Sequence, residues 1–375
     1  MQLEHSLGWL ALALTPGLGA RLAAKLLRAF GSPEEVFRAS LTELEACKLK
    51  ADTAQAIASQ KPQQDAEKEL AAVRKLDCQL VHWEEDAYPP LLKQIYDPPV
   101  LLYVRGKMEL LTRHCLSIVG TRRPTPYGNQ MADKLARELA LRGLVIVSGL
   151  ARGVDSTAHK GALSAPGGAT IGVLGTGADV IYPKENKKVF AQMLEQGAVI
   201  SEFPLGTFPA PQNFPIRNRI IAGMSLGTVV VEGAQYSGSL ITARLAMECS
   251  REVFGVPGNA TQPSSFGPNQ LIKQGAKLVT GWEDVIDELP TEIRTALVPV
   301  ESPAAEQRNL LVEESLSPTE RALFDLLQPD ESRHVDELVE TTGLNSSEVL
   351  PALFELEMKG LIRQLPGKNF IKVLL

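Results

Sequence analysis

Seven short apolar runs between residues 115 and 280 constrain the fold of this chain more than any other feature. Each run has four to six residues, is rich in Val and Ile, and precedes a longer stretch with helical spacing. The runs lie at residues 115–120, 144–149, 170–175, 198–201, 228–232, 253–257 and 277–280. They lack the polar alternation of strands with one wet face, so both of their faces are covered. The pattern predicts an α/β fold with a doubly wound, mostly parallel sheet that ends near Leu289.

A small helical unit is expected before this region. Residues 1–65 have the leucine spacing of short helices, and the polar, Pro-containing stretch at 59–65 marks a boundary. The sheet domain then occupies residues 66–289. It opens with a helix at about 65–76, a strand at 79–82 and a turn-rich, then extended piece at 88–106.

A third unit is expected at the C-terminal end. Residues 290–317 lack periodicity and are rich in Pro, Ala, Glu and Ser, which predicts a linker. Residues 318–375 contain three amphipathic helical patterns and then a hairpin around Pro366-Gly367. That order of elements is typical of a small winged-helix domain.

The net charge excludes a protein held to nucleic acid by bulk attraction, but it allows a local basic site. Lys and Arg number 38 against 44 Asp and Glu, which gives −6. Residues 311–375 hold 6 bases and 12 acids, so the first 310 residues are balanced at 32 against 32. The whole deficit therefore lies in the C-terminal segment.

Cysteine usage and hydropathy indicate a cytoplasmic protein with no membrane contact. Cys47, Cys78, Cys115 and Cys249 form no CxxC pair, so we expect free thiols in a reducing compartment and no metal site. The first residues have no basic segment before the apolar run, which favours a helix over a signal peptide. No apolar run reaches the length of about 18 residues that a membrane span needs.

Small, amide-presenting and cationic residues follow the expected strands. In an open parallel sheet the ligand lies outside the carboxyl ends of the strands, where helix N-termini offer free N–H groups. Six cations are expected at that edge, enough for several phosphates in a row: Arg122, Arg123, Arg152, Lys184, Arg217 and Arg219. Phe214 stands beside two of them, and base stacking on such a ring suits single-stranded nucleic acid. The alternative is that Phe214 is core and the arginines are surface charges.

Enzyme patterns are weak. Gly175-Thr-Gly177 lacks the third glycine of a dinucleotide site, and no Gly-Lys-Ser/Thr of a phosphate-binding loop follows a strand. Ser237 or Ser239 could be a nucleophile with His159 as base, but a Ser-Gly-Ser at a helix start is more simply a cap that binds an anion. For His159 we favour a structural hydrogen bond to Asp155 over a catalytic role.

Six motifs in order over about residues 80–290 resemble the DNA-processing protein A family, DprA or Smf. They are Ser117-Ile-Val-Gly-Thr-Arg122, the Ser148-Gly-Leu-Ala to Leu163 segment, Leu174-Gly-x-Gly177 with Tyr182-Pro, Ser201-Glu-x-Pro, Phe214-Pro-x-Arg217-Asn-Arg219, and Ser237-Gly-Ser-Leu-Ile-Thr242-Ala. The resemblance implies an extended Rossmann-like domain that binds single-stranded DNA without catalysis, needs no cofactor, and loads the recombinase RecA during natural transformation. Thr15-Pro-Gly-Leu-Gly19 also resembles a helix-hairpin-helix turn of a SAM-like domain, although a helix cap explains it equally well.

Site roles follow from this resemblance together with the cationic set. We expect Arg122, Lys184, Arg217 and Arg219 on phosphates and Phe214 stacked on a base. The rest of the expected DNA site is Gly120, Thr121, Arg123, Gly149, Arg152, Gly153, Asn218, Ser237, Gly238 and Ser239. The resemblance also implies a homodimer through about residues 267–279, with Leu271 and Ile272 at the interface.

Two further expectations concern function. The rival hypothesis is a Rossmann-like nucleotide-binding enzyme, a nucleoside-monophosphate glycosidase, but Pro166-Gly-Gly168 is not followed by the pattern of that group. The winged helix would be a duplex-DNA reader by fold analogy. Its acidity argues instead for protein binding or for restraint of the DNA site.

Overall fold

The computed structural model describes residues 6–297, 316–329 and 331–373. Its centre is one nine-stranded sheet in the order β1-β2-β6-β5-β4-β3-β7-β8-β9. Seven strands are parallel, as predicted, and they are β3 (Cys115–Val119), β4 (Val145–Ser148), β5 (Ala169–Val173), β6 (Ala198–Ser201), β7 (Gly227–Val230), β8 (Glu252–Gly255) and β9 (Lys277–Leu278). Two antiparallel strands, β1 (Gln79–His82) and β2 (Leu101–Gly106), extend the β6 edge.

Helices cover both faces of the sheet, which makes the fold doubly wound. Alternate residues of β4 show the two faces, because Ile146 packs with one apolar cluster while Val145 and Val147 pack with the other. One face carries α8 (Pro126–Leu141), α9 (Val154–Ser164), α10 (Lys187–Gln196) and α14 (Trp282–Ile286). The other face carries α11 (Asn213–Gly223), α12 (Gly238–Glu248) and α13 (Phe266–Lys273). Four short 3-10 turns complete the domain: η1 (Leu92–Gln94), η2 (Met108–Thr112), η3 (Lys184–Asn186) and η4 (Pro263–Ser265).

The chain reverses its winding direction at β3. From β3 the strands run outward through β4 and β5 to β6, and the chain then returns to place β7 on the other side of β3. The loops that leave β3 and β7 therefore diverge, and a crevice opens between them at the carboxyl ends of the strands.

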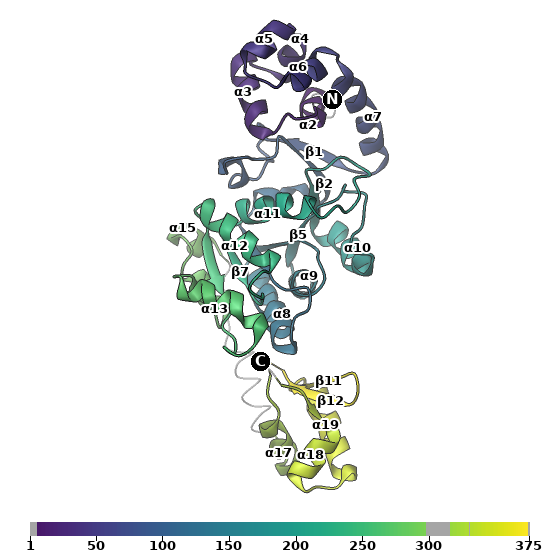
Figure 1. Cartoon of the computed structure of the whole chain (residues 1–375). Helices are drawn as coiled ribbons and strands as arrows, with labels where there is room; N and C mark the ends of the chain where they lie inside the picture. The colour runs from purple at the N-terminus through teal and green to yellow at the C-terminus, as the bar shows by residue number, and fades with distance from the viewer. Residues whose placement is uncertain (1–5, 298–315, 330, 374–375) are drawn as a thin grey trace.

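Among the residues described from Ser6 onward, six helices form the N-terminal unit, at the purple end of the chain in Figure 1. They are α2 (Leu7–Leu14), α3 (Ala20–Phe30), α4 (Pro33–Arg38), α5 (Leu41–Ala46), α6 (Ala51–Ala58) and α7 (Lys61–Lys75). α7 starts before the predicted residue 65 because Pro62 is suited to the first turn of a helix. The expected boundary after residue 65 falls inside α7. Apolar residues of this unit also form one continuous core with those of β1 and β2.

The C-terminal unit has the expected winged-helix order. Its elements are α17 (Pro318–Leu326), β10 (Arg333–His334), α18 (Val335–Thr342), α19 (Ser346–Met358), β11 (Ile362–Leu365) and β12 (Asn369–Lys372). It has its own apolar core, which includes Leu323, Phe324 and Leu356. It lies at the opposite end of the molecule from the N-terminal unit (Figure 1), and the Gln130 side chain on α8 donates a hydrogen bond to the carbonyl of Lys372 at 3.1 Å.

The expected linker is not wholly irregular. Residues 291–296 form a short helix, α15 (Thr291–Ala296), and Ile293 and Leu297 pack against the apolar cluster below α8. The sequence did not predict α15, because this helix places only one turn of apolar residues against the core. Residues 298–315 of that expected linker lie outside the described residues.

Candidate nucleic-acid interface

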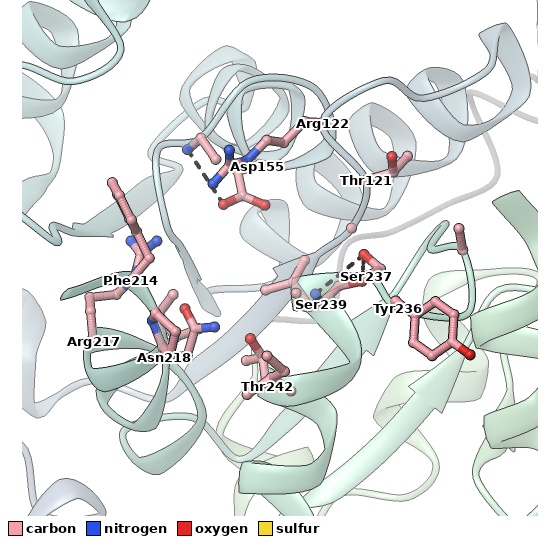
Figure 2. Close-up of a pocket in the computed structure, with 18 of the residues that line it drawn as sticks. Thr121, Arg122, Asp155, Phe214, Arg217, Asn218, Tyr236, Ser237, Ser239 and Thr242 are labelled. Atoms are coloured by element: carbon pink, nitrogen blue, oxygen red, sulfur yellow. Dashed lines mark hydrogen bonds between the residues drawn. The ribbon is translucent and has the colours of Figure 1, made fainter. Parts of the chain in front are cut away.

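A cavity of about 880 Å³ lies at the switch point of the sheet. Its walls come from the loop after β3, the start of α9, the first turns of α11 and the loop from β7 into α12. Figure 2 shows Arg122, Phe214 and Ser237 on three sides of this cavity. Sequence reasoning placed the ligand at this edge of the sheet, and the structure brings these three predicted residues together there.

Arg217 and Asp155 form the buried floor of the cavity. Arg217 is only 4% exposed, and its Nη1 donates to the carbonyls of Gly149, at 2.8 Å, and Val173. The Asp155 carboxylate accepts the N–H groups of Gly149 at 3.1 Å and Ala151 at 3.4 Å. Burial lowers the pKa of Arg217 to about 10, although the Asp155 charge opposes the shift. The same burial raises the pKa of Asp155, with Arg217 opposing it.

This floor explains why Gly149 is glycine. A Cβ there would lie 2.5 Å from Nη2 of Arg217, so the guanidinium fills the space that a side chain would need. Arg217 thus fixes the ends of β4 and β5 as well as facing the cavity. A contact between Arg217 and a phosphate stays a prediction: the guanidinium lines the cavity, but its Nη1 is already bonded to two backbone carbonyls.

An aromatic wall stands above the floor. The guanidinium carbons of Arg122 and Arg217 lie 5.9 and 6.0 Å from the centre of the Phe214 ring. Tyr182 lies against the same ring, with centroids 5.6 Å apart and planes tilted by 40°. Phe214 is half-buried and not a core residue, so a flat ligand can reach one side of its ring.

Arg122 is the most available cation of the site. It is exposed at the rim of the cavity and has no ion-pair partner among the described residues. Its loop is held by hydrogen bonds from the N–H of Thr121 to the carbonyl of Glu232, at 2.7 Å, and from the N–H of Val154 to the carbonyl of Thr121, at 3.2 Å. Gly153 allows this close approach, since it has a φ of +76° and a Cβ would collide with the Thr121 oxygen. Gly120 has the same reason to be glycine, because a Cβ would lie 2.6 Å from the Val154 side chain.

The N-terminus of α12 faces the cavity from the other side. Ser237 is the N-cap, and its Oγ lies 2.8 Å from the Oγ of Ser239 and accepts the Ser239 N–H at 3.4 Å. A Cβ on Gly238 would meet no atom within 4 Å, so the backbone is open to a ligand there. Free N–H groups and the helix dipole together favour an anion at this position.

The remaining predicted cations do not line the cavity. Arg219 is 13% exposed, and it bonds Asp97 at 3.0 Å and the partly buried Glu202 at 2.7 Å. Arg152 is paired with Glu185, while Arg123 and Lys184 are exposed outside the cavity lining. The expectation that Arg219 meets phosphate needs correction, because its side chain points from α11 to the β6 loop and not to the cavity.

His159 is structural, but its expected partner was wrong. It is fully buried, its Nδ1 lies 2.6 Å from the Thr170 hydroxyl, and its Nε2 accepts the N–H of Leu150 at 3.3 Å. Asp155 bonds backbone N–H groups instead. No interaction joins His159 to Ser237 or Ser239 among the described residues, so the structure offers no Ser-His pair for nucleophilic catalysis there.

Leu271 also differs from its expected role. It is 7% exposed and packs in the main core, and Ile272 is half-buried against Gly255. An amphipathic helix next to an edge strand looks the same in sequence whether its apolar face meets this chain or a second copy.

Two aromatic residues of the site were not predicted to touch the ligand. Tyr182 is 40% exposed beside Phe214, and Tyr236 is 92% exposed at the rim of the cavity (Figure 2). The sequence could have pointed to both tyrosines, because each lies next to a strand-end segment that was already expected to bind ligand.

Within the described ranges, no group of three or more His, Cys, Asp and Glu side chains could hold a metal ion, and no helix is long and apolar enough to cross a membrane. All four cysteines are unpaired.

The fold defines a Rossmann-like protein with a cavity at the switch point of its sheet and an appended winged helix. The matching family models are DNA recombination-mediator protein A over residues 79–290 and the DprA winged helix domain over residues 304–368. The chain belongs to the DNA recombination-mediator protein A family, DprA/Smf.

Relatives and solved structures agree with this assignment. Protein Smf of Escherichia coli is 40% identical over 82% of this chain and 80% of its own, and Protein Smf of Synechocystis is 33% identical over 96% and 97%. The crystal structure of DprA from Streptococcus pneumoniae superposes with a TM-score of 0.68 at 36% identity, covering 76% of this chain and 98% of that one. A Helicobacter pylori DprA structure, described for its single-stranded DNA binding mode, matches at a TM-score of 0.52 and 32% identity, covering 59% and 97%.

Proposed function

We propose that this protein binds single-stranded DNA in the cavity at the switch point, without sequence preference, and acts as a recombination mediator. The observation that carries the proposal is the presence of a partly exposed aromatic wall, an arginine without an ion-pair partner among the described residues, and an open helix N-terminus in one cavity. The single-stranded DNA binding mode described for the Helicobacter pylori relative supports the same ligand.

In this proposal each wall of the cavity contacts a different part of the DNA strand. Phe214 and Tyr182 stack an unpaired base, Arg122 neutralises a phosphate, and the Gly238 amide with the hydroxyls of Ser237 and Ser239 holds a second phosphate. Duplex DNA fits less well because its bases are already stacked and cannot reach the Phe214 ring. Stacking and phosphate contacts read no base edges, so sequence preference is weak.

The biological role goes further than the geometry. We propose that the protein loads RecA onto incoming strands during natural transformation, works in the cytoplasm as a homodimer, and has no catalytic step. The unpaired thiols support a reducing compartment. β9 is the last strand of the sheet, with Leu278 42% exposed, and it offers a surface for the second copy in place of Leu271.

Fluorescence anisotropy of labelled oligonucleotides tests the DNA ligand. Oligo-dT and mixed-sequence single strands are expected to bind with similar affinity, and duplex of equal length much more weakly. The same sample incubated with nucleoside monophosphates is expected to release no free base. Turnover at enzyme-like rates, or a preference for duplex, would overturn the proposal in favour of the glycosidase or of a duplex reader.

Two further experiments address the partners. RecA filament growth on single strands already covered by a strand-binding protein is expected to accelerate when this protein is added, and an unchanged rate would contradict loading. Sedimentation is expected to give the dimer mass for the wild type and the monomer mass for Leu278→Lys. Met247→Lys, at a 51% exposed position on α12, is the matched control and keeps the dimer.

A further inference from the structure

The winged-helix unit exposes a row of large apolar side chains on α19. Leu350, Phe354 and Met358 are 51%, 61% and 70% exposed. They are four residues apart, so they lie on one face of the helix, over about 12 Å at 1.5 Å per residue. The core side of the helix is served by Val349 and Leu353, which are buried. The row is therefore not needed for the unit's own packing.

A small cavity adjoins this row. It has a volume of about 200 Å³ and lies between α19 and the β11–β12 hairpin. Phe354, Leu353, Val335 and Phe370 give it an apolar lining, and Glu357, Gln364 and Lys368 stand at its edge. A cavity of this kind next to a row of exposed apolar residues can take one large side chain of a partner.

Charge disfavours DNA as the partner of this face. From Ser346 to Met358, α19 has no Lys or Arg, while Glu348, Glu355 and Glu357 lie on it. Most cations of the unit are engaged elsewhere. Lys359 bonds Glu320 at 2.6 Å, Arg321 and Arg333 lie 3.8 Å from Asp325 and Glu337, and the Lys372 ammonium lies 3.7 Å over the Phe324 ring. A helix that enters a major groove needs basic and amide side chains, and α19 presents Leu, Phe, Met and Glu instead.

A second copy of the same face is disfavoured for a related reason. Two α19 helices packed face to face would bring two acidic surfaces together, and like charges at an interface oppose association. A basic partner would instead be attracted to the acidic surface of α19.

We propose that the exposed face of α19 binds a basic amphipathic helix of a partner protein. Apolar residues at i, i+4 and i+8 of that helix pack on Leu350, Phe354 and Met358, and one of them enters the cavity beside the hairpin. Lys and Arg flanking the apolar row meet Glu355 and Glu357. In this proposal the winged helix binds a protein, and DNA binds only to the sheet domain.

The probe for this surface is a synthetic helical peptide of about 18 residues, with leucines at helical spacing, an N-terminal fluorescein and lysines on the other face. A labelled peptide of the same composition in shuffled order, without that spacing, is the control. Binding to the full chain is followed by fluorescein anisotropy. We expect the amphipathic peptide to bind at least about tenfold more tightly than the shuffled one.

Variants of the full chain locate the binding site. The double variant Phe354→Ser with Met358→Ser and the single variant Leu350→Lys are each expected to weaken the amphipathic peptide about tenfold, with an unchanged thermal midpoint because these side chains are exposed. Phe208→Ser and Met247→Ser, at sites 71% and 51% exposed on the sheet domain, are matched controls and leave the affinity unchanged. Glu355→Gln with Glu357→Gln weakens the peptide mainly at low salt.

Any of the following outcomes would overturn the proposal. The first is equal binding of the two peptides, or equal weakening in the control variants. The second is loss of self-association in the Phe354→Ser, Met358→Ser variant, which would assign the face to a second copy. The third is loss of duplex binding in that variant, which would make α19 a DNA-reading helix. Oligo-dT affinity is unchanged in all these variants, so failure here is separable from failure of the proposed DNA site.

Discussion

Arg122 and Arg217 carry the same charge and lie near the same ring, but their surroundings give them different roles. Arg217 is buried with Asp155 and holds two backbone carbonyls, so its removal would disturb the ends of β4 and β5. Arg122 is exposed and has no ion-pair partner among the described residues. Only a cation that is still solvated exchanges counterions when a phosphate arrives.

Arg122→Ala is expected to weaken single-strand binding and to reduce the slope of log affinity against log salt by about 0.7 for each phosphate that is no longer neutralised. The measurement is anisotropy at several salt concentrations. Arg28→Ala, at an exposed position on α3 and outside the cavity lining, is the control. If the slope and the affinity of Arg122→Ala both match the wild type, Arg122 is not in the site.

Tyr236 is exposed at the rim of the cavity, beside the Ser237 cap, and its ring is free to stack. Tyr236→Ala is expected to weaken oligo-dT by about 1 to 3 kcal/mol while the salt slope stays constant, because stacking releases no counterions. Tyr236→Phe keeps the ring and the affinity. An abasic oligonucleotide should not distinguish Tyr236→Ala from the wild type, and a decrease of equal size on that strand would contradict stacking.

At the scale of elements, the loops after β3, β4, β5 and β7 depend on one another. Arg217 on α11 holds the ends of β4 and β5, the Glu232 carbonyl holds the loop after β3, and Ser237 starts α12. His159 on α9 adds a link from Leu150 to Thr170, and so joins the end of β4 to β5. These hydrogen bonds fix the positions of the loops that line the cavity relative to one another.

His159 makes stability depend on pH. Burial lowers its pKa to about 3 from an ordinary value of 6.5. Below pH 6.5 the unfolded chain takes up the proton and the folded chain does not, so stability is full above that pH and falls by about 1.4 kcal/mol per unit as pH drops towards 3.

Urea unfolding at several pH values measures this effect. His159→Gln lacks the titrating group, so it is expected to be less stable at pH 7 and to have a shallower fall in acid than the wild type. His334→Gln, at a half-exposed ring in the winged-helix unit, is the control. Equal slopes for wild type and His159→Gln would show that the imidazole is not kept neutral in the folded state.

At the scale of the whole molecule, charge is divided between the units. Residues 298–375 hold 7 Lys and Arg against 14 Asp and Glu, so the part before them has 31 against 30 and is nearly neutral. The winged-helix unit touches α8 through Gln130 and places its acidic surface on the same molecule as the DNA cavity. We therefore expect its net effect on a DNA strand to be repulsive or absent.

Truncation after Leu297 tests this division, and it keeps Ile293 and Leu297, which pack on the sheet domain. Single-strand affinity is expected to be retained or slightly raised, because net negative charge is removed. The amphipathic peptide should no longer bind. A fall of about tenfold or more in single-strand affinity would show that the C-terminal unit contributes to DNA binding.

The sequence by itself determined the sheet, the parallel direction of its strands and the edge at which the cavity opens. Continuous apolar runs cannot be satisfied unless both faces are covered, and the ends of parallel strands must meet at one edge, so β3 to β9 and the cavity followed from local pattern. The winged-helix order and the cap at Ser237 were equally local. The sequence did not determine which neighbour each buried polar side chain contacts. Arg217 and Arg219 are two residues apart on one helix, yet α11 turns one towards Asp155 and the other towards Glu202.

The same holds for His159, which met Thr170 instead of Asp155, and for Leu271, whose apolar face met this chain's own core. Only the tertiary structure decided these contacts, because charge and apolarity state what a side chain requires, while the packing of distant segments decides which neighbour supplies it.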